Sequence, residues 1–428
     1  MRRLSTNWGR WPVLMIAGLW LLMPLRAEET TTTDGADSLM RLLPLLTGNL
    51  QGVVTPIEGR PLTWSLALPQ AGGGGVRKGE AKITGQDMSL KIAVEFDPEA
   101  RRLRWRVTEG RVGMAGWLAV LATRPELAEA LAGATATGTL EIAGEGVVDG
   151  KGPTGTLTLD WREGTARNDD QGWSVEGINL RIGGDVAKLA AGTVPVRLSV
   201  KTLSTSTFGA RNLTLGAGLR DFERVEVTGM KIEIAGGFVS AAPFSFSMAA
   251  PVLSVDFDMR GVGLQDLVVF VPATLTEAKG RISGKLKLDW NPTDGVQVGA
   301  GELVLDKSEP TTLRLAANPG FLTEEVPMRF VLAPWLGPLK GLFSPVNPSY
   351  KTMQEIELGK LGLLVEALNV RLTPEGDLMG RSASIFVRAR PEKAGSVIDV
   401  VTFQINVSGP LSQVLRLGME QNFSIQLK

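Results

Sequence analysis

The sequence predicts a mostly β protein whose strands each present one apolar and one polar face. The main observation is that apolar and polar residues alternate in short segments from about residue 50 to the end of the chain. Successive side chains of a strand point to opposite faces, so this alternation indicates strands with one apolar face. The clearest segments are Arg224–Thr228, Lys231–Ile234, Lys285–Asp289 and Thr402–Ser408.

The composition excludes most catalytic chemistry. The chain has no Cys and no His, which removes thiolate nucleophiles, Cys-based zinc sites, the commonest general base and any Ser-His-Asp arrangement. A hydrolase that uses paired carboxylates is the enzyme class that is left. The acid pairs Asp169-Asp170 and Glu324-Glu325 are adjacent in sequence, so on a strand their side chains would face opposite sides. We therefore predict that the protein is not an enzyme and needs no cofactor or metal.

The N-terminus predicts export from the cytoplasm. Residues 1–27 contain four Arg and no acid, and the apolar run Trp11–Leu25 is followed by Arg26 and Ala27. This is the pattern of a signal peptide, although Pro24 interrupts the run and Leu25 stands where a small residue is preferred. An uncleaved N-terminal anchor is the alternative. Both predict a periplasmic location. The remainder of the chain is slightly acidic, so no nucleic-acid partner is expected.

The order of elements follows from the local pattern. After a linker and a short helical piece at 28–49, Gly72–Gly75 fits a hairpin tip between strands. Gly133 is a candidate C-cap for a helix near 115–132, and Pro272 is a candidate stop for a helix at Leu264–Phe270. The remaining expectations are strands at about 50–112, 135–260, 280–316 and 360–408, an irregular Pro-rich stretch at 319–350 and a closing helix at Leu411–Leu417.

One motif occurs twice. Gly155–Trp161 reads GTLTLDW and Gly284–Trp290 reads GKLKLDW, so a Gly-led strand that ends in Asp-Trp recurs in both halves of the chain. This predicts one structural unit used twice. Two unrelated strands with alternating Leu are the simpler interpretation.

From about Leu219 onward the order of segments resembles the C-terminal domain of YdbH-like proteins, also labelled a dicarboxylate transport domain. That family belongs with the AsmA-like and TamB-type intermembrane phospholipid transport proteins. Together with the local patterns, the resemblance divides the chain into four regions: a signal peptide or anchor at 1–27, a linker and short helix at 28–49, a β-rich half with a helix near 115–132 at 50–218, and the YdbH-like domain at 219–428. The matching stretches are Val225–Phe238, Ala242–Phe246, Leu253–Gly261, Leu264–Leu267, Gly280–Leu288, Leu368–Val387, Phe403–Val407 and Val414–Leu417.

The resemblance implies a long, twisted antiparallel sheet folded into an open trough with an apolar interior. Such proteins move phospholipids between the inner and outer membranes of the cell envelope, and some continue into an outer-membrane lipoprotein partner. We discount dicarboxylate transport, because a polar dianion needs a pore or a cluster of basic donors. The expected function is therefore lipid transport in the periplasm, which serves outer membrane biogenesis.

The alternation itself is compatible with lipid binding. Exposing an acyl chain to water costs about 0.8 kcal/mol per CH₂, so a lining of apolar side chains would offset on the order of 12 kcal/mol for a long tail. In a β-sandwich, a solenoid or a closed barrel the same residues would form a packed core, which is the alternative prediction. The residues expected to line the groove are Val225, Val227, Ile232, Ile234, Leu286, Leu288, Phe403, Ile405 and Val407.

Two further segments are candidates for contacts with lipid or membrane. Arg102, Arg104 and Arg106 alternate with apolar residues, so their guanidinium groups share one strand face and could hold phosphate head groups. A solvated outer face is the alternative. The apolar, Pro-rich segment Pro334–Phe343 could dock on a membrane or partner, or plug the fold as a buried loop.

Overall fold

The computed structural model describes residues 48–408, with gaps at 58–59, 69–74, 123–127, 129–130, 206–208, 222, 249, 267, 269–274, 292–294, 331–344, 377–379 and 394. The predicted signal or anchor segment, the piece at 28–47, the segment Pro334–Phe343 and the closing helix Leu411–Leu417 lie outside these ranges.

The described residues form a mostly β structure, as predicted. Their 22 strands belong to one antiparallel sheet that is not closed into a barrel, and three α-helices join some of the strands. The described strands therefore do not form the closed barrel of the alternative prediction. The chain divides into two compact units, of which the first holds the residues up to Ile232 with 242–253 and 291–295, and the second holds the rest.

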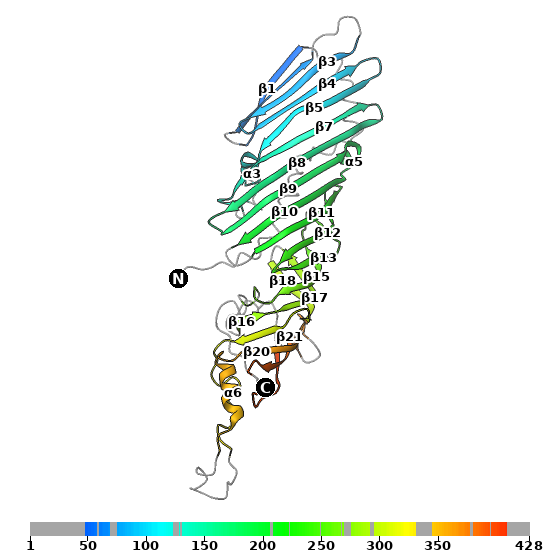
Figure 1. Cartoon of the computed structure of the whole chain (residues 1–428). Coiled ribbons are helices and arrows are strands. Elements are labelled where there is room, and N and C mark those ends of the chain that lie inside the picture. The colour runs from blue at the N-terminus through cyan, green and yellow to red at the C-terminus, as the bar shows by residue number, and fades with distance from the viewer. Residues whose placement is uncertain are drawn as a thin grey trace. The chain divides into compact units, whose positions relative to one another are not determined.

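The first unit is a row of hairpins. Its strands pair antiparallel in the order β1, β2, β3, β4, β5, β7, β8, β9, β10 and β11, which Figure 1 shows side by side. The short β6 pairs with the end of β8, and β12 pairs with β14. The strands are β1 Gly48–Ile57, β2 Arg60–Leu68, β3 Arg77–Gly85, β4 Met88–Asp97, β5 Arg102–Gly113, β6 Thr135–Thr137, β7 Thr139–Asp149, β8 Gly152–Asn168, β9 Trp173–Asp185, β10 Val194–Thr205, β11 Gly209–Arg220, β12 Arg224–Ile234 and β14 Phe244–Ser247.

The second unit continues the pattern with more irregular pairing. β13 pairs with β15, β16 with β19, and β20 with β18, β19 and β21, while β22 pairs with β21. The strands are β13 Gly237–Ala241, β15 Leu253–Gly263, β16 Leu275–Lys279, β17 Arg281–Asn291, β18 Gly295–Asp306, β19 Thr311–Leu315, β20 Leu363–Leu372, β21 Arg381–Pro391 and β22 Val401–Ser408.

The three described helices lie at connections between strands. α3 (Met114–Ala122) follows β5, as the sequence predicted, and Gly133 has the left-handed φ of +74° expected of a helix C-cap. α5 (Val186–Ala190) begins at Asp185, whose carboxylate accepts from Lys188 N, and α6 (Pro348–Glu357) begins at Asn347. Figure 1 shows α3 and α5 at the edges of the sheet rather than over its face.

Of the helix expected at Leu264–Phe270, residues 264–266 form a bend and a turn and Val268 has a 3₁₀ conformation, while residues 267, 269 and 270 lie outside the described set. The backbone N–H of Leu264 donates to Gly280 O at 2.9 Å, which joins this segment to the start of β17.

The repeated motif has the same conformation in both copies. Gly155 in β8 and Gly284 in β17 have positive φ values of +123° and +156°, and each lies against the backbone of the neighbouring strand. Trp161 and Trp290, which end the two copies, are both buried, with 7% of their surface exposed. The two segments are therefore similar in structure as well as in sequence.

Candidate functional site: the apolar face of the sheet

In the first unit, the apolar side chains of successive strands share one face of the sheet. Ile182 of β9 lies opposite Val196 of β10, and Val196 lies opposite Ala217 of β11. All three are buried, and Ile182 is only 1% exposed. Their chain neighbours Arg181 and Arg197 are exposed on the other face. We call these two sides the apolar face and the polar face.

Side chains of the apolar face bury one another within this single sheet. Leu68, Phe96 and Leu103, from β2, β4 and β5, form one cluster and are at most 8% exposed. Leu66, Val94 and Val148 pack against it from the same set of strands and from β7. Because sheets twist and curl, cross-strand neighbours on one face can pack this closely without a second sheet.

Glycines let tryptophan rings lie flat against the backbone on this face. Trp105 of β5 is paired with Gly146 of β7, and a Cβ atom at Gly146 or Gly144 would come within about 3 Å of the indole ring. Trp161 lies over Gly164 and Gly138 in the same way, and its Nε1 donates to Thr137 O at 3.2 Å. The rings thus add apolar area to the face without projecting far from the sheet.

The apolar face becomes accessible at the β1 edge of the first unit. Leu50 lies opposite Leu66, so it belongs to the apolar face, and Trp64 lies two residues before Leu66 on β2. Leu50 is 39% exposed and Trp64 is 37% exposed, whereas Leu68 is 3% exposed. Large apolar groups of this face therefore meet solvent at this edge.

Two of the predicted lining residues of β12, Val225 and Val227, lie on the apolar face. Val225 and Val227 are buried and lie opposite Phe246 and Phe244 of β14. Further along β12, Ile232 is buried and Ile234 is half-buried.

The predicted lining residues of the second unit also share one face. A Cβ atom placed on Gly301 of β18 would lie 3.0 Å from Leu286 Cδ1 of β17, so the side chain of Leu286 lies beside Gly301. Gly301 in turn lies opposite Leu372 of β20. From there the same face continues through β21 to β22, where Ile405 lies opposite Ile385 and Phe403 opposite Val387. Leu286, Leu288, Phe403 and Ile405 are half-buried. Val407 pairs with Ala383, and its side chain lies outside the described set.

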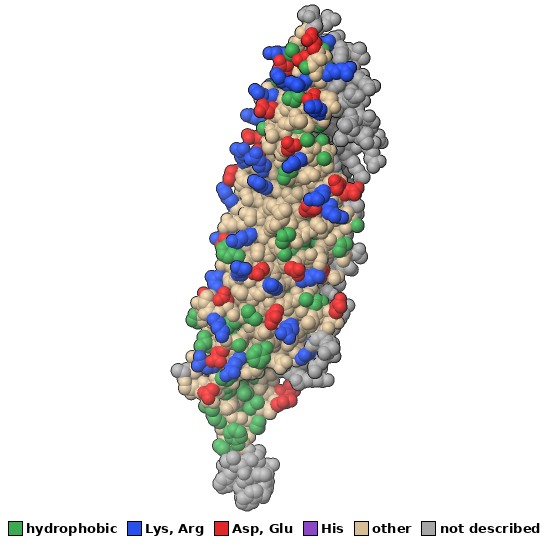
Figure 2. Space-filling view, turned by 90° about the vertical axis from the view of Figure 1, so that its right-hand side faces the viewer, with side chains coloured by type: hydrophobic (Ala, Val, Ile, Leu, Met, Phe, Trp, Pro, Cys, Tyr) green, Lys and Arg blue, Asp and Glu red, His purple; other side chains and the backbone are tan. Residues whose placement is uncertain are grey.

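The structure does not bring the three predicted head-group arginines to this face. Arg102, Arg104 and Arg106 are exposed on the polar face of β5, away from the buried Leu103. Arg106 Nε forms an ion pair with Glu145 Oε2 at 2.9 Å, and Arg104 lies opposite Glu95 of β4. The three arginines therefore lie on a solvated outer face that carries both positive and negative charges. Figure 2 shows basic and acidic side chains interspersed over much of the surface in view.

An irregular segment covers part of the apolar face in the second unit. The ring of Phe321 stacks on that of Phe403, with centroids 6.5 Å apart and planes 18° apart. The segment is held by Glu357 of α6, which is 2% exposed and accepts from Leu322 N at 2.9 Å and from Thr323 Oγ1 at 2.8 Å. Our sequence analysis missed this cover. The Asn347-Pro348 pair, a standard N-cap signal, could have revealed α6.

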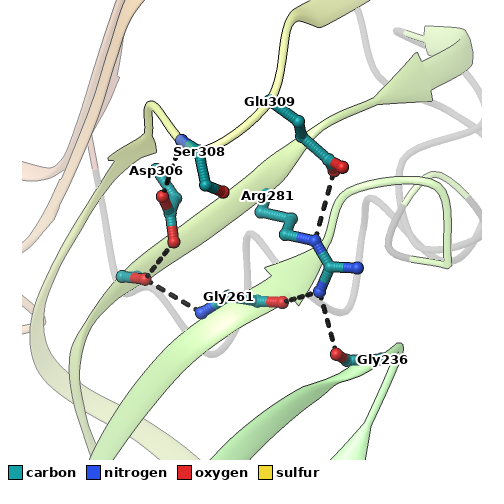
Figure 3. Close-up of polar contacts among 7 residues, drawn as sticks. Gly236, Gly261, Arg281, Asp306, Ser308 and Glu309 are labelled. Atoms are coloured by element: carbon teal, nitrogen blue, oxygen red, sulfur yellow. Dashed lines mark hydrogen bonds and ion pairs between the residues drawn. The ribbon is translucent and has the colours of Figure 1, made fainter.

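A polar network holds the kinks of the second unit (Figure 3). Arg281 Nη1 donates to Gly236 O at 2.8 Å and to Gly261 O at 2.7 Å, and both glycines have positive φ values. Arg281 Nε also pairs with Glu309 at 3.3 Å. Nearby, hydrogen bonds from the backbone N–H and the hydroxyl of Ser308 lower the pKa of Asp306. The guanidinium is thus engaged by protein groups, which indicates a structural role.

Replacing Arg281 tests that role. Arg281→Met removes two charge-assisted hydrogen bonds to carbonyl oxygens, so we expect the free energy of unfolding to fall by about 1.5–3 kcal/mol. Arg281→Lys should recover part of the loss, since one ammonium can still donate to a carbonyl. Chemical denaturation followed by circular dichroism measures both; equal midpoints for Arg281→Met and the wild type would contradict the assignment.

A shallow cleft lies on the polar face of β20 and β21. Asn369 lies opposite Phe386, and Arg371 lies opposite Ser384. Arg371 pairs with Glu302 at 3.6 Å, so its charge is already partly balanced. The cleft is lined by Asn369, Arg371, Thr373, Arg381, Ser384 and Phe386.

The described ranges contain no group of three or more acidic side chains placed to hold a metal ion. Within them, too, no helix has the length and apolar character required to cross a bilayer. No protein-family model, curated protein or solved structure matches the chain.

Proposed function

We propose that the protein is a periplasmic, bridge-like lipid transfer protein that carries phospholipids along the apolar face of its sheet. The observation that carries the proposal is that the described strands form a single unclosed sheet, and that apolar side chains of neighbouring strands share one face of it within each unit. The alternation at the sequence level and the resemblance to YdbH-like proteins support the same function.

The energetics favour acyl chains as the ligand. Each CH₂ group moved from water onto an apolar surface contributes about 0.8 kcal/mol, and no specific polar contact is needed. Leu50 and Trp64, both more than one-third exposed, offer apolar area that solvent can reach at the β1 edge. A row of such side chains can bind a tail at many equivalent positions, which is what movement along a sheet requires.

The proposal places the chain between the inner and outer membranes. It includes an exported N-terminus, either cleaved or kept as an anchor, and an outer-membrane lipoprotein as a further partner. The proposal assigns no catalytic residue, because the sequence lacks His and Cys.

Mass spectrometry of co-purifying lipids tests the function. Ile405→Asp places a carboxylate on the apolar face of β22, whereas Asn406→Asp places the same group on the exposed polar face one residue further on. We expect phospholipid in the wild type and in Asn406→Asp, and about tenfold less in Ile405→Asp, because a charge beside an acyl chain is costly to desolvate.

A second pair probes the first unit at a site that tolerates substitution. Leu50 is already 39% exposed, so Leu50→Asp should fold, and Gln51→Asp on the opposite face of β1 is its control. We expect less bound phospholipid in Leu50→Asp than in Gln51→Asp. Wild-type protein without phospholipid, or equal amounts in the two members of both pairs, would overturn the proposed function.

A further inference from the structure

A short two-stranded stem in the second unit exposes apolar side chains. Phe330 N donates to Pro345 O at 3.0 Å and Asn347 N donates to Met328 O at 2.9 Å, so residues 328–330 and 345–347 run antiparallel. Arg329 lies opposite Val346 in an isolated bridge. We define the hairpin stem as residues 327–330 and 345–346, and all six of these residues are exposed.

The exposure of this stem is large. Met328 is 62% exposed, Val346 is 58% exposed and Phe330 is 42% exposed. Soluble proteins seldom gather large apolar groups in this way without a partner. Figure 2 shows hydrophobic side chains gathered low in the view, in the region where Figure 1 places α6.

The arrangement distinguishes a bilayer from a protein partner. Met328 and Phe330 occupy alternate positions on one strand, while Val346 lies across from the intervening Arg329, so apolar groups stand on both sides of the stem. A protein surface would bury one side of such a stem, whereas a bilayer surrounds an inserted hairpin on all sides. A lipid bilayer is therefore the binding partner that can contact both apolar sides of the stem.

The charge of this part of the chain points to the type of lipid surface. The hairpin stem carries one charged side chain, Arg329, and no Asp or Glu, and Glu324 and Glu325 come just before it in the chain. Basic residues beside apolar anchors favour bilayers with anionic head groups, because the cations lie at the head-group level while the apolar side chains enter the acyl boundary.

We propose that the hairpin stem docks on the surface of a phospholipid bilayer that contains anionic head groups, with Met328, Phe330 and Val346 as the inserted side chains. This inference rests on the proposed function, because that function requires some part of the chain to meet a membrane. The exposed stem supports it independently of whether the apolar face carries lipid.

A single fluorescent label tests the insertion at the site itself. The chain has no Cys, so Met328→Cys can be labelled with an environment-sensitive dye in the full-length protein. Vesicles of phosphatidylcholine with phosphatidylglycerol should shift the emission to the blue, and brominated acyl chains should quench it. Vesicles of phosphatidylcholine alone should give a smaller shift. The label reports on residue 328 whether or not the N-terminus also binds the vesicles.

Matched variants complete the test. Val397 is 59% exposed and lies in another loop, so the label at Val397→Cys should show neither shift nor quenching. In the labelled Met328→Cys protein, the further changes Phe330→Ser and Val346→Ser should abolish both signals. No shift at residue 328, an equal shift at 397, or a shift that survives the double change would overturn the proposal.

The result is separable from that of the proposed function. The Met328→Ser, Phe330→Ser and Val346→Ser triple variant should retain its co-purifying phospholipid, because none of the three residues belongs to the apolar face of the sheet. Conversely, labelled Met328→Cys should still report insertion when it also carries Ile405→Asp.

Discussion

Replacing Gly155 with alanine is expected to disrupt the pairing of β7 with β8 and to lower the free energy of unfolding of the first unit by about 3–5 kcal/mol. Gly155 has a φ of +123°, which side chains other than glycine rarely adopt. A Cβ atom there would lie 2.2 Å from Glu145 O and 2.4 Å from the Cα of Gly146, so the backbone of β7 would have to move. Chemical denaturation followed by circular dichroism measures the change.

Gly229→Ala is the matched control. Gly229 lies within β12, has no unusual φ, and a Cβ atom there would have no neighbour within 4 Å. We expect the change to be neutral or to stabilise by up to about 1 kcal/mol, because alanine restricts the unfolded chain. Equal destabilisation by the two substitutions would show that the close approach at Gly155 does not limit the sheet. Gly284→Ala should repeat the effect in the second copy of the motif, where the Cβ atom would lie 2.0 Å from Glu302 O.

Replacing Glu357 with glutamine is expected to release the segment that covers Phe403. The buried carboxylate accepts hydrogen bonds from Leu322 N, Thr323 N and Thr323 Oγ1. A glutamine side chain has only one acceptor oxygen, and its NH₂ group would face N–H or O–H donors of Leu322 and Thr323. We therefore expect the free energy of unfolding to fall by about 1–3 kcal/mol. Hydrogen exchange of residues 318–326 should accelerate. Glu355→Gln, on the same helix, should leave that exchange unchanged.

The same contact should depend on pH. Burial by itself raises the pKa of Glu357, but the hydrogen bonds from Leu322, Thr323 and Gly320 outweigh it and lower the pKa below the usual 4.5. A lowered pKa in the folded state means that the contribution is complete above the unfolded pKa and is lost as the pH falls through the folded pKa. Protection of residues 318–326 should therefore persist from neutral pH to about 5 and disappear in more acidic solution. Glu357→Gln should lack this acid step, and a wild-type step near neutral pH would contradict the assignment.

The sequence located most strands and the faces of their side chains. The alternation in Arg224–Ile234 correctly separates the buried Val225 and Val227 from exposed Arg224 and Thr228. Alternation is a consequence of covalent strand geometry, so it can be read locally. Gly133 likewise has the left-handed φ of +74° that its prediction as a C-cap residue requires.

Interactions between distant segments could not be predicted in this way. Nothing local indicates that Phe321 stacks on Phe403, or that Leu264 N donates to Gly280 O. α6 is a different case, because Asn347-Pro348 is a local capping signal that the Pro-rich context concealed. The placement of Arg102, Arg104 and Arg106 on the polar face follows from their register against β4, and the sequence alone offered no partner for them.

By itself, the sequence determined that the protein is built of two-faced strands and that His or Cys chemistry plays no part in its function. Only the tertiary structure decided that these strands form one unclosed sheet, that their apolar faces coincide from strand to strand, and that residues 318–326 cover part of that face. The reason is physical: a strand's two faces are fixed by its own backbone, whereas what packs against either face depends on long-range contacts whose free energies no short segment encodes.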